Sequence, residues 1–300
     1  YSAGELVPAL ECLGAVANGT AQMGHDAAYY HAGKSEGCAF FTAFPFGFTM
    51  GEMAAWIKHG NGQKLWDELY APFGIRGFQA GSTGTQMFGW FRREIRSLAD
   101  LDGLKFRTPG NQGRVLQKLG VTPVSLPGGE IFPALQSGAI DGAEWVGPYN
   151  DLALGFYQVC RYYYSPGYHE PGPALQLTVN EQAWRSLPPD LQAIVRAAAD
   201  AATTDMYAEY TAQSGPALRT LVQKHGVIVR SLPEDVLIAC GEKSNEVLNE
   251  IHAGDTSPNR IVRRIIEDFL AFRQDVIPWT RVGEQAFVNA RRLPFEFRLK

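Results

Sequence analysis

The chain has 300 residues, of which 45% are hydrophobic and 19% charged, so it is an ordinary folded protein and not a disordered one. This length predicts either one large α/β domain or two lobes with a seam between them. The 27 basic and 31 acidic residues give a net charge of −4 with no block of lysine or arginine, so we expect no nucleic-acid partner.

The amino-terminal third combines helical segments with one buried loop. Apolar residues at helical spacing predict helices over residues 5–16 and 51–69, and a strand is predicted over 75–80. Between the helices, the segment 38–48 is rich in Phe and interrupted by Pro45, which indicates a buried loop. The uncharged stretches 37–51 and 77–91 are shorter than the roughly 18 apolar residues of a membrane-spanning helix.

Strands and helices alternate from residue 104 to residue 145, which favours a mostly parallel sheet in that region. The predicted strands there are 104–107, 121–126 and part of 139–145, and the predicted helices are 112–119 and 130–137. The remainder has strands at 175–179 and 227–232 and helical segments at 188–225, 233–252 and 261–277. We expect the first of these helical segments to be interrupted near Gly215 and Pro216.

The cysteines and one serine motif define alternatives for the chemistry. Cysteines at positions 12, 38, 160 and 240 form no Cys-x-x-Cys pair, which argues against a zinc or redox motif, and we expect free buried thiols in place of disulfides. Gly33–Gly37 reads Gly-Lys-Ser-Glu-Gly, the nucleophile-elbow pattern of a serine esterase, with His169 and His225 downstream. The Phe-rich, Pro-interrupted segment that follows is a poor helix start, so a hydrolase built on Ser35 is only a distant alternative.

Three charged residues stand at predicted strand ends or in aromatic surroundings. Arg107 ends a short strand before Thr-Pro-Gly, where an arginine can hold a carboxylate with its planar guanidinium. Glu144 precedes Trp145 after another strand, and Glu170 follows an aromatic run. A buried glutamate requires a cation, which can be either a basic side chain or a metal ion. Two glutamates, the Gln86 amide and a backbone carbonyl would form an all-oxygen site suited to Na⁺ or Ca²⁺.

The segments 66–74, 81–92, 101–107 and 134–142 occur in the order and spacing of a known family. On these segments the chain resembles the solute-binding subunits of tripartite ATP-independent periplasmic (TRAP) transporters. The segments 144–148 and 162–170 are similar to the branch that binds 2-oxo acids such as pyruvate. The resemblance implies a non-catalytic α/β protein with two lobes, a ligand cleft between them and a carboxy-terminal helical extension.

The resemblance also implies a division of the chain and a set of site residues. Lobe I would comprise residues 1–82 and about 175–255, lobe II residues 83–174, and the extension, a candidate dimerisation element, residues 256–300. Arg107 would hold the ligand carboxylate, with Tyr29 or Tyr30 nearby. The implied ligand-binding set is Arg107, Gln86, Tyr29, Tyr30, Trp145 and Asn150, and the implied cation ligands are Gln86, Glu144, the Trp145 carbonyl and Glu170.

The charges support a bound cation independently. Two glutamates and a monocarboxylate carry three negative charges against the single positive charge of Arg107, which is unfavourable in a closed cleft. A 2-oxo acid can chelate the ion through its carboxylate and keto oxygens. We therefore expect a pyruvate-like ligand with bridging Na⁺ or Ca²⁺, and a calcium-dependent binder of 2-hydroxy acids such as lactate is the closer alternative.

The family further implies a periplasmic protein that delivers its ligand to membrane permease subunits and that can dimerise through the carboxy-terminal helix. The apolar stripe of this helix from Ile261 could instead pack on its own lobe. The chain opens with Tyr-Ser-Ala-Gly-Glu, which is not a signal peptide. Members of the family begin with a strand and a helix before the segment that starts here at Ser2, so we expect that first unit to be missing from this chain.

Overall fold

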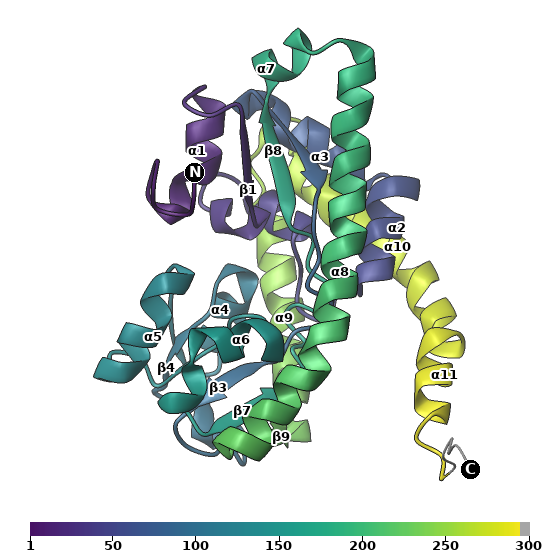
Figure 1. Ribbon diagram of the computed structural model, residues 1–300. Coiled ribbons are helices and arrows are strands. Elements are labelled where there is room, and N and C mark those ends of the chain that lie inside the picture. The colour runs from purple at the N-terminus through teal and green to yellow at the C-terminus, as the bar shows by residue number, and fades with distance from the viewer. Residues whose placement is uncertain (295–300) are drawn as a thin grey trace, which may run out of the picture.

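The computed structural model describes residues 1–294 and has two lobes, each built on a β-sheet (Figure 1). The lobe with the amino terminus contains a three-stranded sheet in the order β1 (Met23–Asp26), β8 (Gln176–Asn180), β2 (Ile75–Gln79). The second lobe contains a six-stranded sheet in the order β5 (Thr122–Val124), β4 (Lys105–Arg107), β6 (Gly142–Ala143), β3 (Gly89–Phe91), β7 (Tyr162–Ser165), β9 (Ile228–Ser231). The two-lobed α/β architecture predicted from the sequence is therefore confirmed.

The α-helices surround these sheets and follow the predicted apolar spacing closely. Thr49 and Glu52 form a capping box that starts the second helix, as their spacing requires. The helices are α1 (Cys12–Ala17), α2 (Met50–His59), α3 (Gly62–Tyr70), α4 (Gly110–Gln117), α5 (Gly128–Ser137), α6 (Pro148–Leu154), α7 (Glu181–Ser186), α8 (Pro189–His225), α9 (Glu234–Gly254), α10 (Ile261–Val282) and α11 (Glu284–Ala290).

The sheets are less parallel than the sequence predicts. The strands β5, β4 and β6 are parallel, as the strand–helix alternation indicates, and β7 is parallel to β9. However, β3 is antiparallel to both β6 and β7, and the whole sheet of the first lobe is antiparallel. The reason for the orientation of β3 is that the chain enters it directly from the first lobe through the segment 80–88, without a helix of the second lobe that would return it to the same edge of the sheet.

The chain crosses between the sheets in the segment 80–88, from β2 to β3, and again in the segment 166–175, from β7 to β8. Strand β9 differs from the predicted division, because its residues fall within the range 175–255 assigned to the first lobe. It instead pairs with β7 and forms the edge of the second lobe's sheet. Helix α8 explains this placement: it packs on β2 in the first lobe and on α6 in the second, and so carries the chain back across (Figure 1).

The predicted interruption of α8 near Gly215 and Pro216 is wrong, because the helix runs without a break from residue 189 to residue 225. Both residues are exposed, so water can bind the carbonyl of Ala212 that a proline cannot satisfy. Beyond the proline, Leu221 is fully buried against the second lobe and holds the continuing helix in place.

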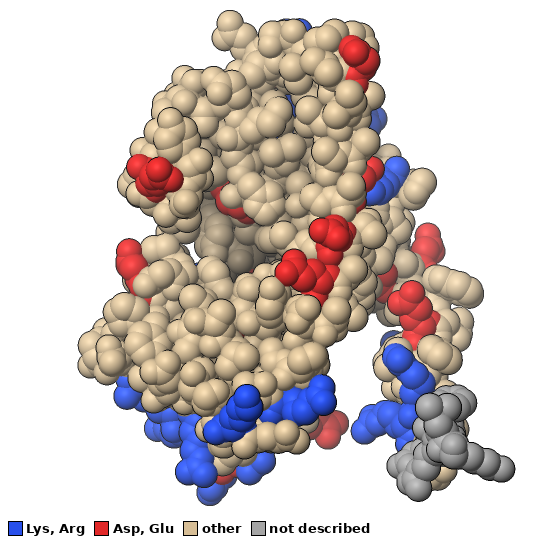
Figure 2. Space-filling model, viewed as in Figure 1, with Lys and Arg blue, Asp and Glu red and all other residues tan. Residues whose placement is uncertain are grey.

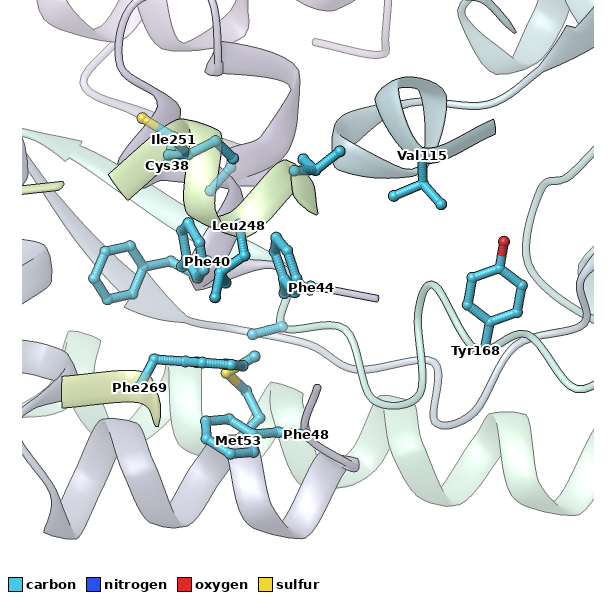
Figure 3. Packing of buried hydrophobic residues seen from close by; sticks show 14 of the residues in the cluster. Cys38, Phe40, Phe44, Phe48, Met53, Val115, Tyr168, Leu248, Ile251 and Phe269 are labelled. Atoms are coloured by element: carbon cyan, nitrogen blue, oxygen red, sulfur yellow. The ribbon is translucent and has the colours of Figure 1, made fainter. Parts of the chain in front are cut away.

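The Phe-rich segment forms the centre of the core of the first lobe, as predicted. Cys38, Phe40 and Phe41 have no exposed surface, and Phe48 is buried as well. Figure 3 shows Phe40 and Phe44 packed between Leu248 of α9 and Phe269 of α10, with Phe48 and Met53 close to the Phe269 ring. Aromatic stacking contributes to this packing, with Phe40 and Phe44 rings 5.0 Å apart and nearly parallel.

The four cysteines are free thiols, as predicted from the lack of pairing motifs. Three of them are buried, and Cys12 is partly exposed. Within residues 1–294, no helix has both the length and the apolar composition that a membrane crossing requires.

Helix α10 attaches the carboxy-terminal extension to the body of the protein. Its stripe of Ile261, Ile265 and Phe269 is buried in the core of the same chain. Beyond this stripe, the end of α10 and α11 extend away from the lobes (Figure 1) and carry the exposed apolar side chains of Trp279, Val282, Phe287 and Val288. Leu293, after the end of α11, is exposed as well. Residues 295–300 of the predicted extension lie outside the described residues.

Candidate functional site

The two crossing segments come together and place Gln86 beside Glu170. The backbone N–H of Gln86 donates to the backbone carbonyl of Glu170 at 3.1 Å, and the backbone N–H of Gly167 donates to the backbone carbonyl of Gln86 at 2.9 Å. The side chains also meet, with Gln86 Nε2 donating to Glu170 Oε2 at 2.8 Å. A Cβ atom on Gly167 would lie 2.4 Å from the Gln86 carbonyl oxygen, so only glycine allows the segments to approach this closely.

Arg107 and Glu144 form a buried ion pair at the ends of neighbouring parallel strands. Arg107 ends β4 opposite Ala143 of β6, so the next residue, Glu144, lies beside the guanidinium. Arg107 Nη1 donates to Glu144 Oε1 at 2.6 Å and to the Glu144 carbonyl at 3.0 Å, while Nε donates to the Leu126 carbonyl at 3.0 Å. The exposed fractions are 1% for Arg107 and 0% for Glu144, so this pair is shielded from water.

The Trp145 indole covers the guanidinium of Arg107, with the Arg107 Cζ atom 5.1 Å from the ring centroid. Gly128 at the start of α5 permits this position, since a Cβ atom there would lie 2.5 Å from the indole. Buried Asp151 of α6 fixes the backbone that follows Trp145 by accepting hydrogen bonds from the N–H groups of Val146 and Gly147 at 3.2 and 3.1 Å.

Asp151 is itself held by aromatic donors of the second lobe's sheet. Trp90 Nε1 donates to Asp151 Oδ2 at 2.9 Å, and the Tyr163 hydroxyl donates to the same oxygen at 2.7 Å. Burial raises the pKa of Asp151 to about 7, although these four hydrogen bonds act in the opposite direction. The sequence did not predict a role for Asp151, because its side-chain partners Trp90 and Tyr163 are distant in the chain and no motif links them to it.

The first lobe contributes Tyr29 and Tyr30 from the short 3-10 helix η2 (Ala28–His31). The Tyr30 hydroxyl accepts a hydrogen bond from Arg107 Nη2 at 3.4 Å, and the two tyrosine rings contact each other edge to face. Burial, and then the charge of Glu170, raise the pKa of Tyr29 well above its usual value. The sequence left open which tyrosine faces the site, and the structure brings both to it.

The electrostatics favour a positive ion among these residues. Burial, and then the neighbouring Glu144 charge, raise the pKa of Glu170 well above the usual carboxyl value, with Arg107 acting in the opposite direction. For Arg107, burial acts against the charge, but Glu144 and the two tyrosines outweigh it and raise its pKa. The site therefore combines two carboxyl groups with one permanent positive charge.

Several buried polar atoms in this cluster have no hydrogen-bond partner among the residues that the structure describes. They are Gln86 Oε1, Glu144 Oε2 and both ring nitrogens of His169. Buried polar atoms are nearly always paired, so unpaired ones mark the position of a missing partner. The oxygens are hard donors suited to Na⁺ or Ca²⁺, and the cation site predicted from the sequence fits the residues present.

His169 is the member of the cluster that sequence reasoning did not place in the site. One ligand atom from each of Glu144, His169 and Glu170 lies within 4.8 Å of the others, and all three side chains are buried. The signal in the sequence was the position of His169 directly before Glu170, at the end of the aromatic run.

Asn150 and Ser35 do not join the cluster. Asn150 lies in α6 and accepts a hydrogen bond from the Tyr210 hydroxyl of α8 at 2.7 Å, and within residues 1–294 no hydrogen bond links it to the cluster. Ser35 follows the 3-10 helix η2 and precedes another 3-10 helix, η3 (Glu36–Phe41), so the strand that a nucleophile elbow requires is not there. The His225 ring packs at a tilt against the Tyr157 ring in the second lobe, with the ring centroids 3.9 Å apart.

Comparison with known proteins identifies the family. Residues 1–255 match the family described as bacterial extracellular solute-binding protein, family 7. The chain belongs to this family. Its members are the solute-binding components of TRAP transporters and are periplasmic, which confirms the family predicted from the sequence motifs.

Three relatives illustrate the place of this family 7 protein among solute-binding proteins. A monocarboxylate 2-oxoacid-binding periplasmic protein of Nostoc sp. (strain PCC 7120) is 42% identical over 96% of this chain and 78% of the relative. A TRAP transporter solute-binding protein of Bordetella bronchiseptica RB50, a mixed-occupancy dimer with copurified calcium and picolinate, has a TM-score of 0.94 and 39% identity, covering 97% of this chain and 85% of that chain. A TRAP periplasmic solute-binding protein of Pseudoalteromonas atlantica T6c, with bound sodium and pyruvate, has a TM-score of 0.90 and 40% identity, covering 96% of this chain and 85% of that chain.

The surface of the protein is hollowed between the two lobes (Figure 2). The crossing segments that carry Gln86 and Glu170 join the lobes, Arg107 and Glu144 come from the second lobe, and the two tyrosines come from the first. This arrangement allows a small ligand to contact both lobes at once, which is the geometry expected of a binding protein that closes on its solute.

Proposed function

We propose that this protein captures a small 2-oxo monocarboxylate, such as pyruvate, together with a bridging Na⁺ or Ca²⁺, and delivers it to the permease of a TRAP transporter in the periplasm without catalysing a reaction. The observation that carries the proposal is the buried Arg107–Glu144 pair beside Gln86 Oε1 and Glu144 Oε2, two oxygens that form no hydrogen bond within residues 1–294. These groups offer a carboxylate-binding cation and oxygen donors side by side. The relatives that bind 2-oxo acids support it further.

The proposed cation ligands are Gln86, Glu144, the Trp145 carbonyl and Glu170. When bound, the cation neutralises the glutamates and offers the ligand a positive centre. With the ligand carboxylate, Glu144, Glu170 and Arg107 carry a net charge of −2; Na⁺ reduces this to −1 and Ca²⁺ to zero. Glu144 Oε1 is already bonded to Arg107, which leaves Oε2 for the ion.

The proposed ligand-binding residues orient the 2-oxo acid and exclude water. Arg107 would hold the carboxylate, and Trp145 covers the guanidinium on one side. Tyr29 and Tyr30 close the site from the first lobe, so that ligand binding would draw the lobes together. Asn150 stays a proposed contact that would require its bond to Tyr210 to break.

The test is titration calorimetry on protein freed of metal with a chelator. Pyruvate should bind tightly when Na⁺ or Ca²⁺ is present and weakly without either, and acetate should bind poorly because it lacks the keto oxygen. Competition between pyruvate and lactate decides between the 2-oxo acid and the 2-hydroxy acid. Equal pyruvate binding with and without cations would contradict the proposal.

The extension supports a further proposal, that the protein dimerises through α10 and α11. Trp279 and Val282 are each 71% exposed, and Phe287 is 66% exposed, on helices that project from the body. Exposed apolar side chains grouped in this way are typical of a protein–protein interface. The dimeric Bordetella bronchiseptica relative is consistent with a second copy as the partner.

A further inference from the structure

His169 is a buried imidazole whose ring nitrogens form no hydrogen bond with the part of the chain that the structure describes. Its side chain is 1% exposed, and neither ring nitrogen forms a hydrogen bond within residues 1–294. Its ring is held edge to face against Phe88 and Tyr168, with centroid distances of 6.1 and 6.0 Å. Packing therefore fixes the ring in an orientation that leaves both nitrogens without a hydrogen bond to residues 1–294, with Nε2 facing Glu144, and such an arrangement points to a ligand of His169.

The position of His169 relative to Glu144 suits two ligands of one ion. His169 Nε2 lies 3.4 Å from Glu144 Oε2, yet no hydrogen bond joins these atoms. Two ligand atoms that are each about 2.1 Å from a tetrahedral zinc ion lie about 3.4 Å apart. Glu170 supplies a third donor within 4.8 Å of the other two.

We propose that this pocket also binds a first-row divalent transition metal ion such as Zn²⁺, with His169, Glu144 and Glu170 as its ligands. The inference rests on the proposed function, because the same two carboxylates would hold Na⁺ or Ca²⁺. Oxygen donors suit Na⁺ and Ca²⁺, whereas an imidazole nitrogen favours zinc, copper and related ions. His169 is thus the residue that determines which class of metal the pocket accepts.

The charges of the site allow this binding. Glu144 Oε1 is engaged by Arg107 at 2.6 Å, which orients the carboxylate so that Oε2 faces His169. A divalent ion with Glu144, Glu170 and Arg107 leaves one positive charge, and a monocarboxylate ligand would neutralise it. The 2-oxo acid could therefore complete the coordination of Zn²⁺ as it would that of Ca²⁺.

The experiment compares metals in the wild type and in His169→Gln, with His252→Gln as the matched control. His252 is a partly exposed histidine 2.9 Å from the Glu267 carboxylate, so it reproduces a histidine–carboxylate pair outside the pocket. Zn²⁺ binding is measured by calorimetry on metal-free protein, and Co²⁺ is used as a visible-absorption probe. Calcium-dependent pyruvate binding is measured on the same samples.

The wild type and His252→Gln should bind Zn²⁺ with equal affinity, and His169→Gln should bind it at least about 100-fold more weakly. Calcium-dependent pyruvate binding by His252→Gln should stay within about threefold of the wild type, since His252 lies outside the pocket. Equal Zn²⁺ affinity in all three proteins, or Zn²⁺ binding that excess Ca²⁺ and pyruvate do not displace, would overturn the proposal.

A second measurement needs no substitution in the pocket. Pulsed electron paramagnetic resonance on the Cu²⁺-loaded His252→Gln protein should detect the remote nitrogen of a coordinated imidazole, and excess Ca²⁺ with pyruvate should abolish that signal. A missing signal, or one that persists under competition, refutes ligation by His169. Loss of calcium-dependent pyruvate binding in the wild type would instead refute the proposed function, so the two failures are distinguishable.

Discussion

Replacing Arg107 is the most direct perturbation of the site. Arg107 is 1% exposed and donates hydrogen bonds to the carboxylate and carbonyl of Glu144 and to the Leu126 carbonyl. Removing one member of a buried, hydrogen-bonded charge pair typically costs about 2–5 kcal/mol in binding. For Arg107→Gln this corresponds to a loss of pyruvate affinity of about 30-fold to several thousandfold.

The same substitution should also lower the stability of the folded protein. Breaking a buried ion pair leaves the other charge uncompensated, which costs about 3–5 kcal/mol. Arg107→Lys separates the two effects, because lysine keeps the charge but not the planar fork that matches a carboxylate. We expect Arg107→Lys to recover most of the stability and only part of the affinity.

The assay combines calorimetric titration with pyruvate at saturating Ca²⁺ and thermal unfolding of each variant. Arg96→Gln is the control, since Arg96 is 79% exposed and water screens its ion pair with Glu94, which should contribute little to stability. A folded Arg107→Gln protein that binds pyruvate within about threefold of the wild type would refute the assignment of Arg107 to the ligand carboxylate.

Three further predictions concern protons, backbone contact and assembly, and a fourth concerns pH-dependent stability. Burial and Glu144 raise the pKa of Glu170, so below that pKa a bound Ca²⁺ ion must displace a proton from this carboxyl group. The affinity for Ca²⁺ should therefore rise with pH. Calorimetry in buffers of different ionisation enthalpy should show proton release in the wild type and none in Glu170→Gln. Gly167→Ala should weaken cation-dependent pyruvate binding at least about tenfold in calorimetric titration, because the added Cβ would push the two crossing segments apart. Unchanged binding would contradict the role of the close contact between Gly167 and Gln86. The double variant Trp279→Ser/Phe287→Ser should be a monomer by light scattering, where the wild type is a dimer, and its affinity for pyruvate should be unaltered. An unchanged molecular mass would exclude α10 and α11 as the dimer interface. The pKa of Asp151 is about 7 in the folded protein and near 3.8 in the unfolded chain. The protonated acid therefore contributes up to about 4 kcal/mol to the free energy of unfolding, and this contribution is lost as the pH rises from about 3.8 through about 7. Denaturant unfolding should show this loss in the wild type and a flatter pH profile in Asp151→Asn.

Local patterns in the sequence determined much of the fold. Apolar residues at helical spacing located most of the helices, and the strand–helix alternation from residue 104 to residue 145 located the three parallel strands β4, β5 and β6. Arg107 could be assigned to a site because it ends a strand, and Glu144 because a glutamate among apolar residues needs a cation. The prediction that α8 would break at Pro216 was wrong, because packing at both ends of a helix outweighs one exposed proline.

The family resemblance located Gln86 and Glu170 by motif, but how the site fits together depends on the tertiary structure. These residues are 84 positions apart in the chain, and they meet because the two crossing segments hydrogen-bond to each other. Only packing shows that both ring nitrogens of His169 lack a hydrogen bond to the described part of the chain, and only the sheet pairing places β9 in the second lobe. The physical reason is that periodicity and propensity act over a few residues, whereas the pairing of buried polar atoms depends on which distant segments the closed core brings into contact.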